Sequence, residues 1–320
     1  MYARLQWALD TPLDSGGAPR EVAIRRGEGL REVEARLEAQ GVLARHSPLA
    51  LWGRLTGRDR RIRAGLYVFT PAQSAREILR VLVEGRTRRL FVTIPEGWLL
   101  ARILPRLAEV LRVPESELVA AASDPALARS LGIPAQGLEG YLFPETYAFE
   151  YGMPVRDALV HMARMCLDRV DESRRRRAAE LGMSLHEVLT LASIVQAEAA
   201  RVEEMPRIAA VYHNRLRQHR RLEADPTAAY AGGRTGQRLL ERDLLVESPY
   251  NTYRHAGLPP GPICSPGLAS IDAVLHPLAG CEDLYFVARG DGTHIFSRTL
   301  AAHNRAREMI RRSRSSQSGR

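Results

Sequence analysis

The chain has 320 residues, of which 45% are hydrophobic and 26% are charged. This composition excludes a disordered chain, a collagen-like chain and a polytopic membrane protein, and the length suits about two domains of roughly 100–200 residues each. The formal net charge is +9, and every basic residue is an arginine. Such an excess of positive charge favours anionic partners: nucleic acid, an anionic membrane face or an acidic polymer.

Residues 1–20 are rich in Gly, Pro and Asp and are typical of a linker. They lack the apolar core of a signal peptide, and no run in the chain approaches the roughly 20 apolar residues that span a bilayer. Taken by themselves, these features predict a soluble cytoplasmic protein.

The next segment predicts a small module of strands and helices. Short β-branched strands begin at Val22 and Val92, and each is followed by a glycine turn and an amphipathic helix. Residues 64–69 indicate another strand, and Ser74 with Glu77 forms a capping box that starts a helix. We expect an α+β module over residues 21–90, which serves either as a plain scaffold or as a wall-polysaccharide-binding module.

The rest of the chain predicts a larger α+β region. Residues 105–183 look largely helical, and the clearest helix spans 184–200, where Ser184 and Glu187 form a second capping box. Beyond residue 220 loops dominate, apart from a hairpin around the turn Gly290–Gly292. The arginine- and serine-rich residues 311–320 predict a disordered basic tail.

Several kinds of chemistry are excluded by missing motifs. The chain contains no dinucleotide fingerprint, phosphate-binding loop, nucleophile elbow or zinc-peptidase motif, and its cysteines form no CxxC pair. We therefore predict neither a metal nor a cofactor. An oxidising compartment would permit a disulfide between Cys264 and Cys281, although their spacing does not fix its geometry.

One carboxylate interrupts an apolar helix face. Leu191, Ile194 and Val195 lie at helical spacing, and the next position of that stripe is Glu198. A carboxyl group beside an apolar stripe is partly desolvated, which raises its pKa toward the range that a general acid needs near neutral pH. The alternative interpretation is a salt-bridged structural glutamate near a helix end.

Polar and aromatic side chains concentrate in the later loops. Tyrosine rings stack on pyranose faces and amides bind sugar hydroxyl and N-acetyl groups, so these loops suit a glycan, although ordinary turn chemistry explains each motif equally well. The residues in question are Asn214, Asp225, Thr227, Tyr250, Asn251 and Tyr253.

The order of seven motifs resembles the YceG-like (MltG) endolytic murein transglycosylases. The motifs are TIPEGW (93–98), LEGYLFPETY (138–147), LASIVQAEA (191–199), HNRL (213–216), EADPT (223–227), YNTYRHAGLPPGPICSPG (250–267) and THIFSRTLAAHN (293–304). Their order and spacing match the family over roughly residues 21–310.

The resemblance implies cleavage of the β-1,4 bond between N-acetylmuramic acid and N-acetylglucosamine in nascent glycan strands, with 1,6-anhydro-muramic ends. It assigns the catalytic role to Glu198, which acts as an acid and then as a base. At Gln196 this chain departs from the family pattern, which has another glutamate there. It makes residues 21–90 a LysM-like module and 91–310 the catalytic domain. The six loop residues are expected in the glycan groove, with Glu139 and Glu145 as second-choice carboxylates.

The resemblance also implies a location and partners. Family members begin with one transmembrane helix, so residues 1–20 are expected to follow an anchor that this chain lacks. We expect a single-pass protein of the bacterial inner membrane with its catalytic domain outside the cytoplasm, acting on glycan strands beside peptidoglycan synthases. The alternatives are a non-catalytic peptidoglycan-binding protein, a muramidase with two catalytic carboxylates and, on arginine content alone, a nucleic-acid-binding protein. The sequence contains no known nucleic-acid-binding motif that would support this last alternative, so no nucleic-acid partner is predicted.

Overall fold

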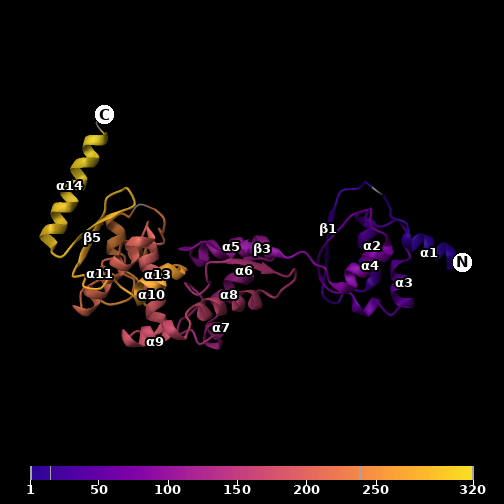
Figure 1. Cartoon of the computed structure of the whole chain (residues 1–320), viewed down its shortest axis with the longest axis horizontal. Coiled ribbons are helices and arrows are strands. Elements are labelled where there is room, and N and C mark those ends of the chain that lie inside the picture. Colours follow the sequence, from indigo (N-terminus) through magenta and orange to yellow (C-terminus); the bar gives the residue numbers. More distant parts are fainter. Residues whose placement is uncertain (1, 15, 238, 319–320) are drawn as a thin grey trace. The chain divides into compact units, whose positions relative to one another are not determined.

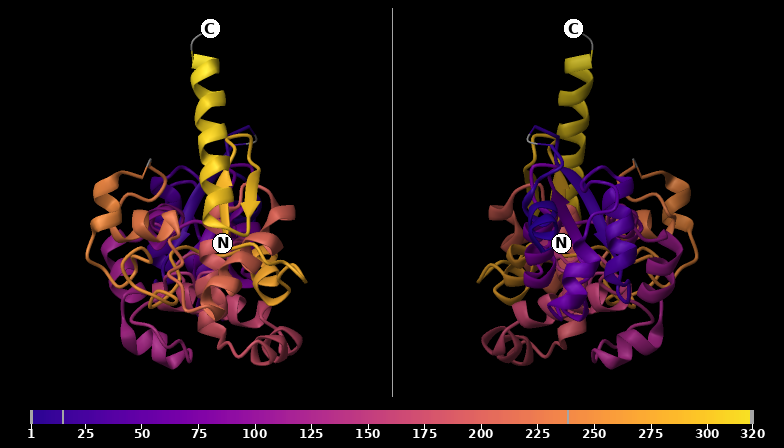
Figure 2. Two further views of the ribbon diagram at one scale, coloured as in Figure 1. Left: turned by 90° about the vertical axis from the view of Figure 1, so that its left-hand side faces the viewer. Right: turned by 90° about the vertical axis from the view of Figure 1, so that its right-hand side faces the viewer.

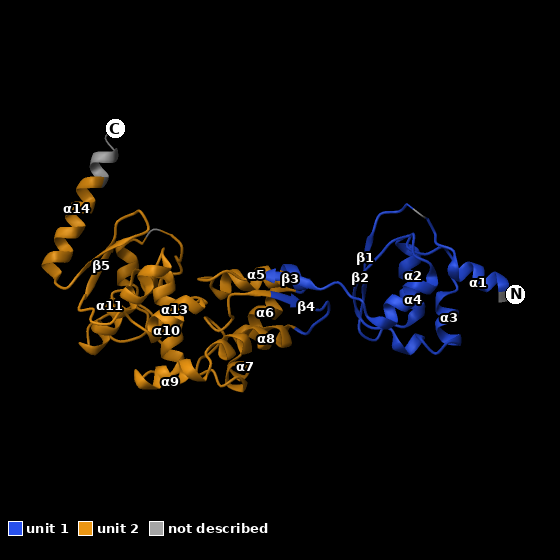
Figure 3. Cartoon of the chain, viewed as in Figure 1, with its two compact units in different colours: residues 1–92, 109–113, 147–154 blue, residues 93–108, 114–146, 155–320 orange. Residues whose placement is uncertain are grey.

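A computed structural model describes residues 2–14, 16–237 and 239–318, which divide into two compact units (Figure 3). Unit 1 comprises Met1–Val92, Glu109–Val113 and Tyr147–Pro154. Unit 2 comprises Thr93–Ala108, Pro114–Thr146 and Val155–Arg320. The chain is of the expected α+β class, with short two-stranded sheets and helices.

Unit 1 is built on an antiparallel pair of strands with helices between them (Figure 1). The order is β1 (Arg20–Ile24), α2 (Leu30–Ala39), α3 (Leu49–Leu55), η1 (Asp59–Arg61), β2 (Gly65–Phe69) and α4 (Ala75–Glu84). Val22 lies opposite Tyr67 in the strand pair, and both side chains are fully buried. The predicted capping box begins α4, because the Ser74 hydroxyl accepts from the Glu77 amide and the Glu77 carboxylate accepts from the Ser74 amide.

The prediction of a linker over residues 1–20 is wrong for the first half of that segment. Residues Tyr2–Asp10 form helix α1, which packs against α4. Leu5 and Leu9 lie one turn apart, and Leu9 is fully buried in the core of unit 1. Asp10 at the end of α1 pairs with Arg76 of α4 at 2.6 Å. The contacts of Leu5 and Leu9 with this core make α1 part of unit 1. The Gly- and Asp-rich composition of residues 1–20 did not indicate them.

A second small sheet pairs β3 (Leu90–Thr93) with β4 (Thr146–Phe149). Between these strands the chain forms three helices, and α8 and α9 follow β4. Their bounds are α5 (Leu100–Leu111), α6 (Glu115–Ala122), α7 (Pro125–Ser130), α8 (Val155–Arg169) and α9 (Glu172–Glu180). Helix α6 packs on α8, in agreement with the helical region predicted for this part of the chain.

The core of unit 2 is α10 (Leu185–Glu198), which packs against α11 (Met205–Arg217) and α13 (Leu268–Leu275) (Figure 1). Every residue of α10 from Val188 to Val195 is buried. The predicted capping box at Ser184 begins this helix. Beyond residue 220 the chain is less loop-rich than expected, because it also forms α12 (Asp225–Ala231) and the short η3 (Glu241–Leu245).

The C-terminal part consists of a hairpin and a long helix. Strands β5 (Tyr285–Ala288) and β6 (His294–Ser297) pair antiparallel around the predicted turn. Helix α14 (Leu300–Ser318) packs on both strands at its beginning and then projects away from unit 2 (Figure 2). Residues 311–318 therefore continue a helix in place of the expected disordered tail, and Glu308 pairs with Arg311 and Arg312 at helical spacing. Residues 319–320 lie outside the described residues.

Among the described residues, no single helix is long and apolar enough to cross a membrane. Helices α9 and α10 pass that length and composition test only as a pair, and the chain bends by 90° between them.

Candidate active site

Glu198 is the last residue of α10, where the buried stripe of that helix reaches the surface. Leu191, Ile194 and Val195 are fully buried, and Glu198 continues their face as a half-buried side chain. Ala199 follows as the capping residue with an extended backbone, and its amide donates to the carbonyl of Val195. The predicted position of this carboxylate, at the edge of an apolar helix face, is confirmed.

The surroundings of Glu198 favour its protonated form. Burial raises the pKa of Glu198 to about 7, the negative charge of Asp225 raises this pKa as well, and a hydrogen bond from Tyr212 and the charge of Arg215 lower it. A carboxyl group with this pKa is protonated in a large fraction of molecules near neutral pH and loses its proton readily. It is therefore suited to act as an acid in one step and a base in the next.

Tyr212 of α11 is the direct partner of Glu198. Its hydroxyl donates a hydrogen bond of 2.8 Å to Oε1 of Glu198, which leaves Oε2 to carry the proton. The Tyr212 ring packs edge-on against Phe286, with ring centroids 5.7 Å apart. Burial and the neighbouring Glu198 raise the pKa of Tyr212 well above its usual value. The phenol therefore stays protonated and remains a hydrogen-bond donor to Glu198.

Asp225 and Tyr253, two of the residues predicted for the glycan groove, lie beside this pair. The Tyr253 hydroxyl donates to Oδ1 of Asp225 at 2.5 Å, and Asp225 itself is exposed. Burial, followed by the charge of Asp225, raises the pKa of Tyr253, and Glu198 adds to this effect. Glu198, Tyr212, Asp225 and Tyr253 therefore share one electrostatic environment, which we call the Glu198 cluster.

Glu139 and Tyr250 line a cavity with a volume of about 240 Å³. Both oxygens of Glu139 accept from the amide of Leu100, at 3.2 and 3.3 Å. Burial raises the pKa of Glu139 to about 7. Tyr250 packs against Tyr230, a residue outside the predicted groove set, with ring centroids 4.9 Å apart. Glu139 is thus a second half-buried carboxyl group with a raised pKa.

Three of the residues predicted for the groove are buried supports of the backbone. The Asn214 amide donates to the carbonyls of Cys281 and Asp283, both at 2.9 Å. Thr227 is fully buried against the Thr252 hydroxyl at 2.7 Å. The Asn251 amide donates to the carbonyl of Val246 at 2.9 Å, and its oxygen accepts from the Tyr253 amide. These side chains hold the loops and are not open to a glycan, which corrects their predicted role.

Glu145 and Gln196 contact residues outside the Glu198 cluster. Glu145 pairs with Arg169 at 2.9 Å on a partly exposed surface. The Gln196 oxygen accepts from the amide of Gly267 at 3.0 Å, so this residue joins the end of α10 to the start of α13. Neither side chain has a described contact with Glu198.

The described residues contain no group of three or more side chains arranged to hold a metal ion. The three cysteines are free thiols, so Cys264 and Cys281 are not paired in this structure. Cys264 donates to the carbonyl of Ser193, whereas Cys281 donates to the carboxylate of Asp283.

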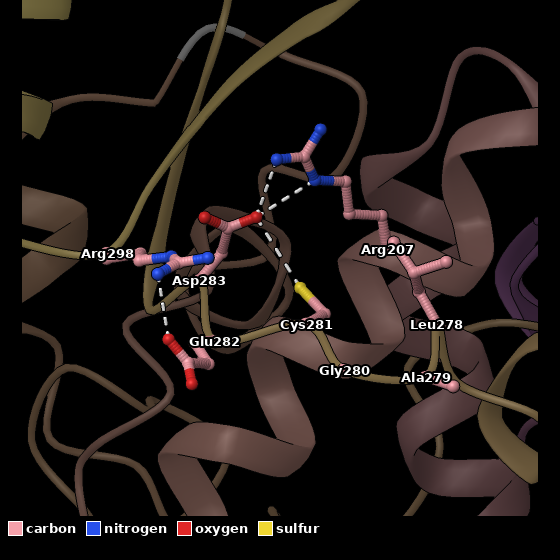
Figure 4. A pocket seen from close by; sticks show the side chains of 8 residues that line it. All are labelled: Arg207, Leu278, Ala279, Gly280, Cys281, Glu282, Asp283 and Arg298. Carbon is pink, nitrogen blue, oxygen red and sulfur yellow. Dashed lines mark hydrogen bonds and ion pairs between the residues drawn. The ribbon is translucent and has the colours of Figure 1, made fainter.

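A second cavity, about 270 Å³ in volume, contains charges that are already neutralised (Figure 4). Arg207 donates to Asp283 at 2.7 and 2.9 Å, and Arg298 pairs with Glu282 at 2.9 Å. No carboxylate drawn in this cavity is left without an arginine.

Comparison with known proteins finds one matching family model and several similar relatives. A model of the YceG-like family matches residues 22–309. The endolytic murein transglycosylase of Bacillus subtilis (strain 168) is 33% identical over 261 residues, covering 77% of this chain and 72% of the relative. Two Streptococcus pneumoniae proteins of the same name are 28% identical, covering 90% of this chain and 58% of each relative, so the chain spans little more than half their length. The crystal structure of a yceG-like protein from Listeria monocytogenes matches with a TM-score of 0.63 at 30% identity, covering 91% of this chain and 100% of that one.

Proposed function

Because the chain belongs to the YceG-like family, we propose that it is an endolytic murein transglycosylase, a lyase acting on peptidoglycan. In this proposal the enzyme cleaves the β-1,4 bond between N-acetylmuramic acid and N-acetylglucosamine within nascent glycan strands. It leaves 1,6-anhydro-muramic ends, which terminates elongation of the strand.

One observation carries the assignment of the catalytic group. Glu198 has a pKa of about 7, is half-buried, and has one oxygen held by Tyr212, while no side chain that the structure describes donates to the other. Ordinary glycosidases use two carboxyl groups that flank the scissile bond. A lytic reaction that consumes no water needs only one, provided that this group is first an acid and then a base.

The first step breaks the glycosidic bond. Protonated Glu198 donates its proton to the bridging oxygen as the bond from the muramic anomeric carbon to that oxygen breaks, and the bond's electron pair leaves with the N-acetylglucosamine. The acetamido carbonyl of the muramic sugar stabilises the positive charge that develops on the anomeric carbon. Glu198 is left as a carboxylate.

The second step closes the anhydro ring. The Glu198 carboxylate takes the proton of the muramic 6-hydroxyl, whose oxygen attacks the anomeric carbon and forms the 1,6-bond. Glu198 is protonated again and the atoms balance without water. Through this cycle Tyr212 orients the carboxyl group, and Asp225 keeps its pKa high enough for the acid step.

The experiment that tests this function is mass spectrometry of the products formed from uncrosslinked glycan strands. We expect internal products with anhydro-muramic ends, and we expect Glu198→Gln to fold normally and to release none. Reducing muramic ends would point to a hydrolase. Equal loss of activity in a well-folded Glu145→Gln variant would also support a two-carboxylate mechanism, and strand binding without any product would favour a binding protein.

We extend the proposal to the rest of the chain. Residues 21–90 would serve as a LysM-like module that holds wall glycan, supported by their strand–helix–helix–strand order and their own buried core. The enzyme would act on the outer side of the bacterial inner membrane, beside the synthases that produce the strands. Retention on isolated cell walls, measured with and without residues 21–90, tests the role of this module.

A further inference from the structure

The cavity beside Glu139 combines several features that attract a positive charge. It is lined by Leu100, Ala122, Ser123, Ala135, Gln136, Gly137, Leu138, Glu139, Tyr230, Tyr250, Gly261 and Pro262. No arginine is among these residues, although the chain carries a net charge of +9. The cavity therefore differs in charge from the chain as a whole.

Glu139 supplies a carboxylate without a cationic partner. Within the described part of the chain it forms no ion pair, and its oxygens accept hydrogen bonds from backbone amides, including that of Leu100. The charged residues Asp283 and Glu282 of the other cavity differ, because each is paired with an arginine (Figure 4). A half-buried carboxylate of this kind gains most from a cation brought by a ligand.

The remaining walls add to the negative potential. Helix α6 ends at Ala122 and Ser123, so the negative end of its dipole lies at the cavity. The rings of Tyr230 and Tyr250 are tilted by 47° to each other, with their centroids 4.9 Å apart. Neighbouring aromatic rings next to a carboxylate form the kind of surface that binds ammonium groups through cation–π contacts.

We propose that this cavity binds a primary ammonium group carried by the peptide of the substrate. The inference rests on the proposed function, because it takes the substrate to be a glycan strand with attached peptides. Peptides that have not been crosslinked carry a free side-chain ammonium on their diamino acid, whereas a crosslink converts that group of the accepting peptide into an amide. The cavity thus favours a strand whose peptides still carry the ammonium group.

Two structural elements, helix α12 and the loop at residues 250–253, contribute residues both to the cavity and to the Glu198 cluster. Helix α12 contributes Asp225 at its first residue and Tyr230 near its end, about 7.5 Å further along the axis. One loop contributes Tyr253 to the Glu198 cluster and Tyr250 to the cavity. In this proposal, helix α12 and this loop connect the place where the strand is cleaved with the cavity that binds its peptide.

The test is a competition between two preparations of the same uncrosslinked strands, one untreated and one with its amines acetylated. Acetylation removes the charge and marks the products by mass. We expect the wild-type protein to show a kcat/KM about tenfold higher on untreated strands. Glu139→Gln keeps an oxygen for the Leu100 amide, and we expect its preference to fall to about one. Glu282→Gln, in the other cavity, is the matched control and keeps the wild-type preference.

Two results overturn the inference: cleavage without preference by the wild-type protein, or an unchanged preference in Glu139→Gln. Absence of cleavage with either preparation instead overturns the proposed function. In that case, fluorescence anisotropy with labelled untreated and acetylated strands decides the inference. Tighter binding of the untreated strands, lost in Glu139→Gln and in Tyr230→Leu but not in Glu282→Gln, supports the ammonium site, and equal binding overturns it.

Discussion

The Tyr212 hydroxyl donates a hydrogen bond of 2.8 Å to Oε1 of Glu198, and so joins the middle of α11 to the end of α10. This bond makes the two oxygens of the Glu198 carboxyl group unequal, because within the described part of the chain only Oε1 accepts a hydrogen bond from a side chain. It also opposes the effect of burial, because a donor stabilises the charged form and lowers the pKa. The pKa of Glu198 thus results from burial and Asp225 acting against Tyr212 and Arg215.

Tyr212→Phe tests this balance with little change in packing, since the ring keeps its contact with Phe286. Loss of the hydroxyl raises the pKa of Glu198 further, so we expect the alkaline limb of the pH profile of kcat/KM to move up by about one pH unit. We also expect kcat to fall about tenfold, because the carboxyl group loses the bond that orients it. A fall in kcat with an unmoved alkaline limb would contradict the proposed link between Tyr212 and the Glu198 proton.

Asp225→Asn is expected to move the same limb in the opposite direction. The negative charge of Asp225 raises the pKa of Glu198, whereas a neutral amide still accepts the Tyr253 hydroxyl. Without that charge the pKa of Glu198 falls, so less of the acid form is present at pH 7 and the alkaline limb shifts to lower pH. Pre-steady-state cleavage followed over pH 5–9 would measure the shift, and Asp225→Glu, which keeps the charge, serves as the control.

The carboxylate that we propose as catalytic, Glu198, was predictable because its signal is local. Leu191, Ile194 and Val195 define a helix face, and a glutamate at the next position of that face stands out in the sequence. Tyr212 was not predictable in the same way, since only the packing of α11 on α10 brings its hydroxyl to Glu198. Its one local signal is a tyrosine beside Ile208 and Val211 on a buried helix face.

The predicted glycan groove shows the limit of residue type as a guide. Asn, Thr and Tyr suit sugar binding and suit loops whose backbone amides and carbonyls need partners, and the sequence does not separate the two. Burial separates them: Asp225, Tyr250 and Tyr253 keep exposed surface, whereas Asn251 has none. Helix α1 was missed for a related reason, because its Leu5 and Leu9 are covered only by the folded unit.

Stability should fall as pH rises through the neutral range. Glu139 and Glu198 each have a folded pKa of about 7, above the usual value of 4.5. Between these values the folded protein binds more protons than the unfolded chain, so the free energy of unfolding is highest below pH 4.5 for these groups and declines toward pH 7. The loss reaches up to about 3 kcal/mol for each carboxyl group.

Urea denaturation at pH 5 and pH 7.5 measures this dependence. We expect Glu198→Gln and Glu139→Gln each to flatten it, because a neutral amide does not titrate, and the double variant to flatten it most. Glu145→Gln, which removes a surface carboxyl group beside Arg169, serves as the control for the loss of one carboxyl group outside these two positions. An unaltered slope in both single variants would mean that neither carboxyl group has a raised pKa.

Asn214→Ala distinguishes a supporting residue from a glycan-binding one. The side chain is 5% exposed, and its amide donates to the carbonyls of Cys281 and Asp283, which hold the loop before β5 against α11. Truncation leaves the buried carbonyl of Asp283 and the partly buried carbonyl of Cys281 short of a donor, so we expect the free energy of unfolding to drop by about 2–4 kcal/mol. KM for uncrosslinked strands should stay unchanged at a temperature where the variant is folded. A rise in KM with unaltered stability would return Asn214 to the glycan groove.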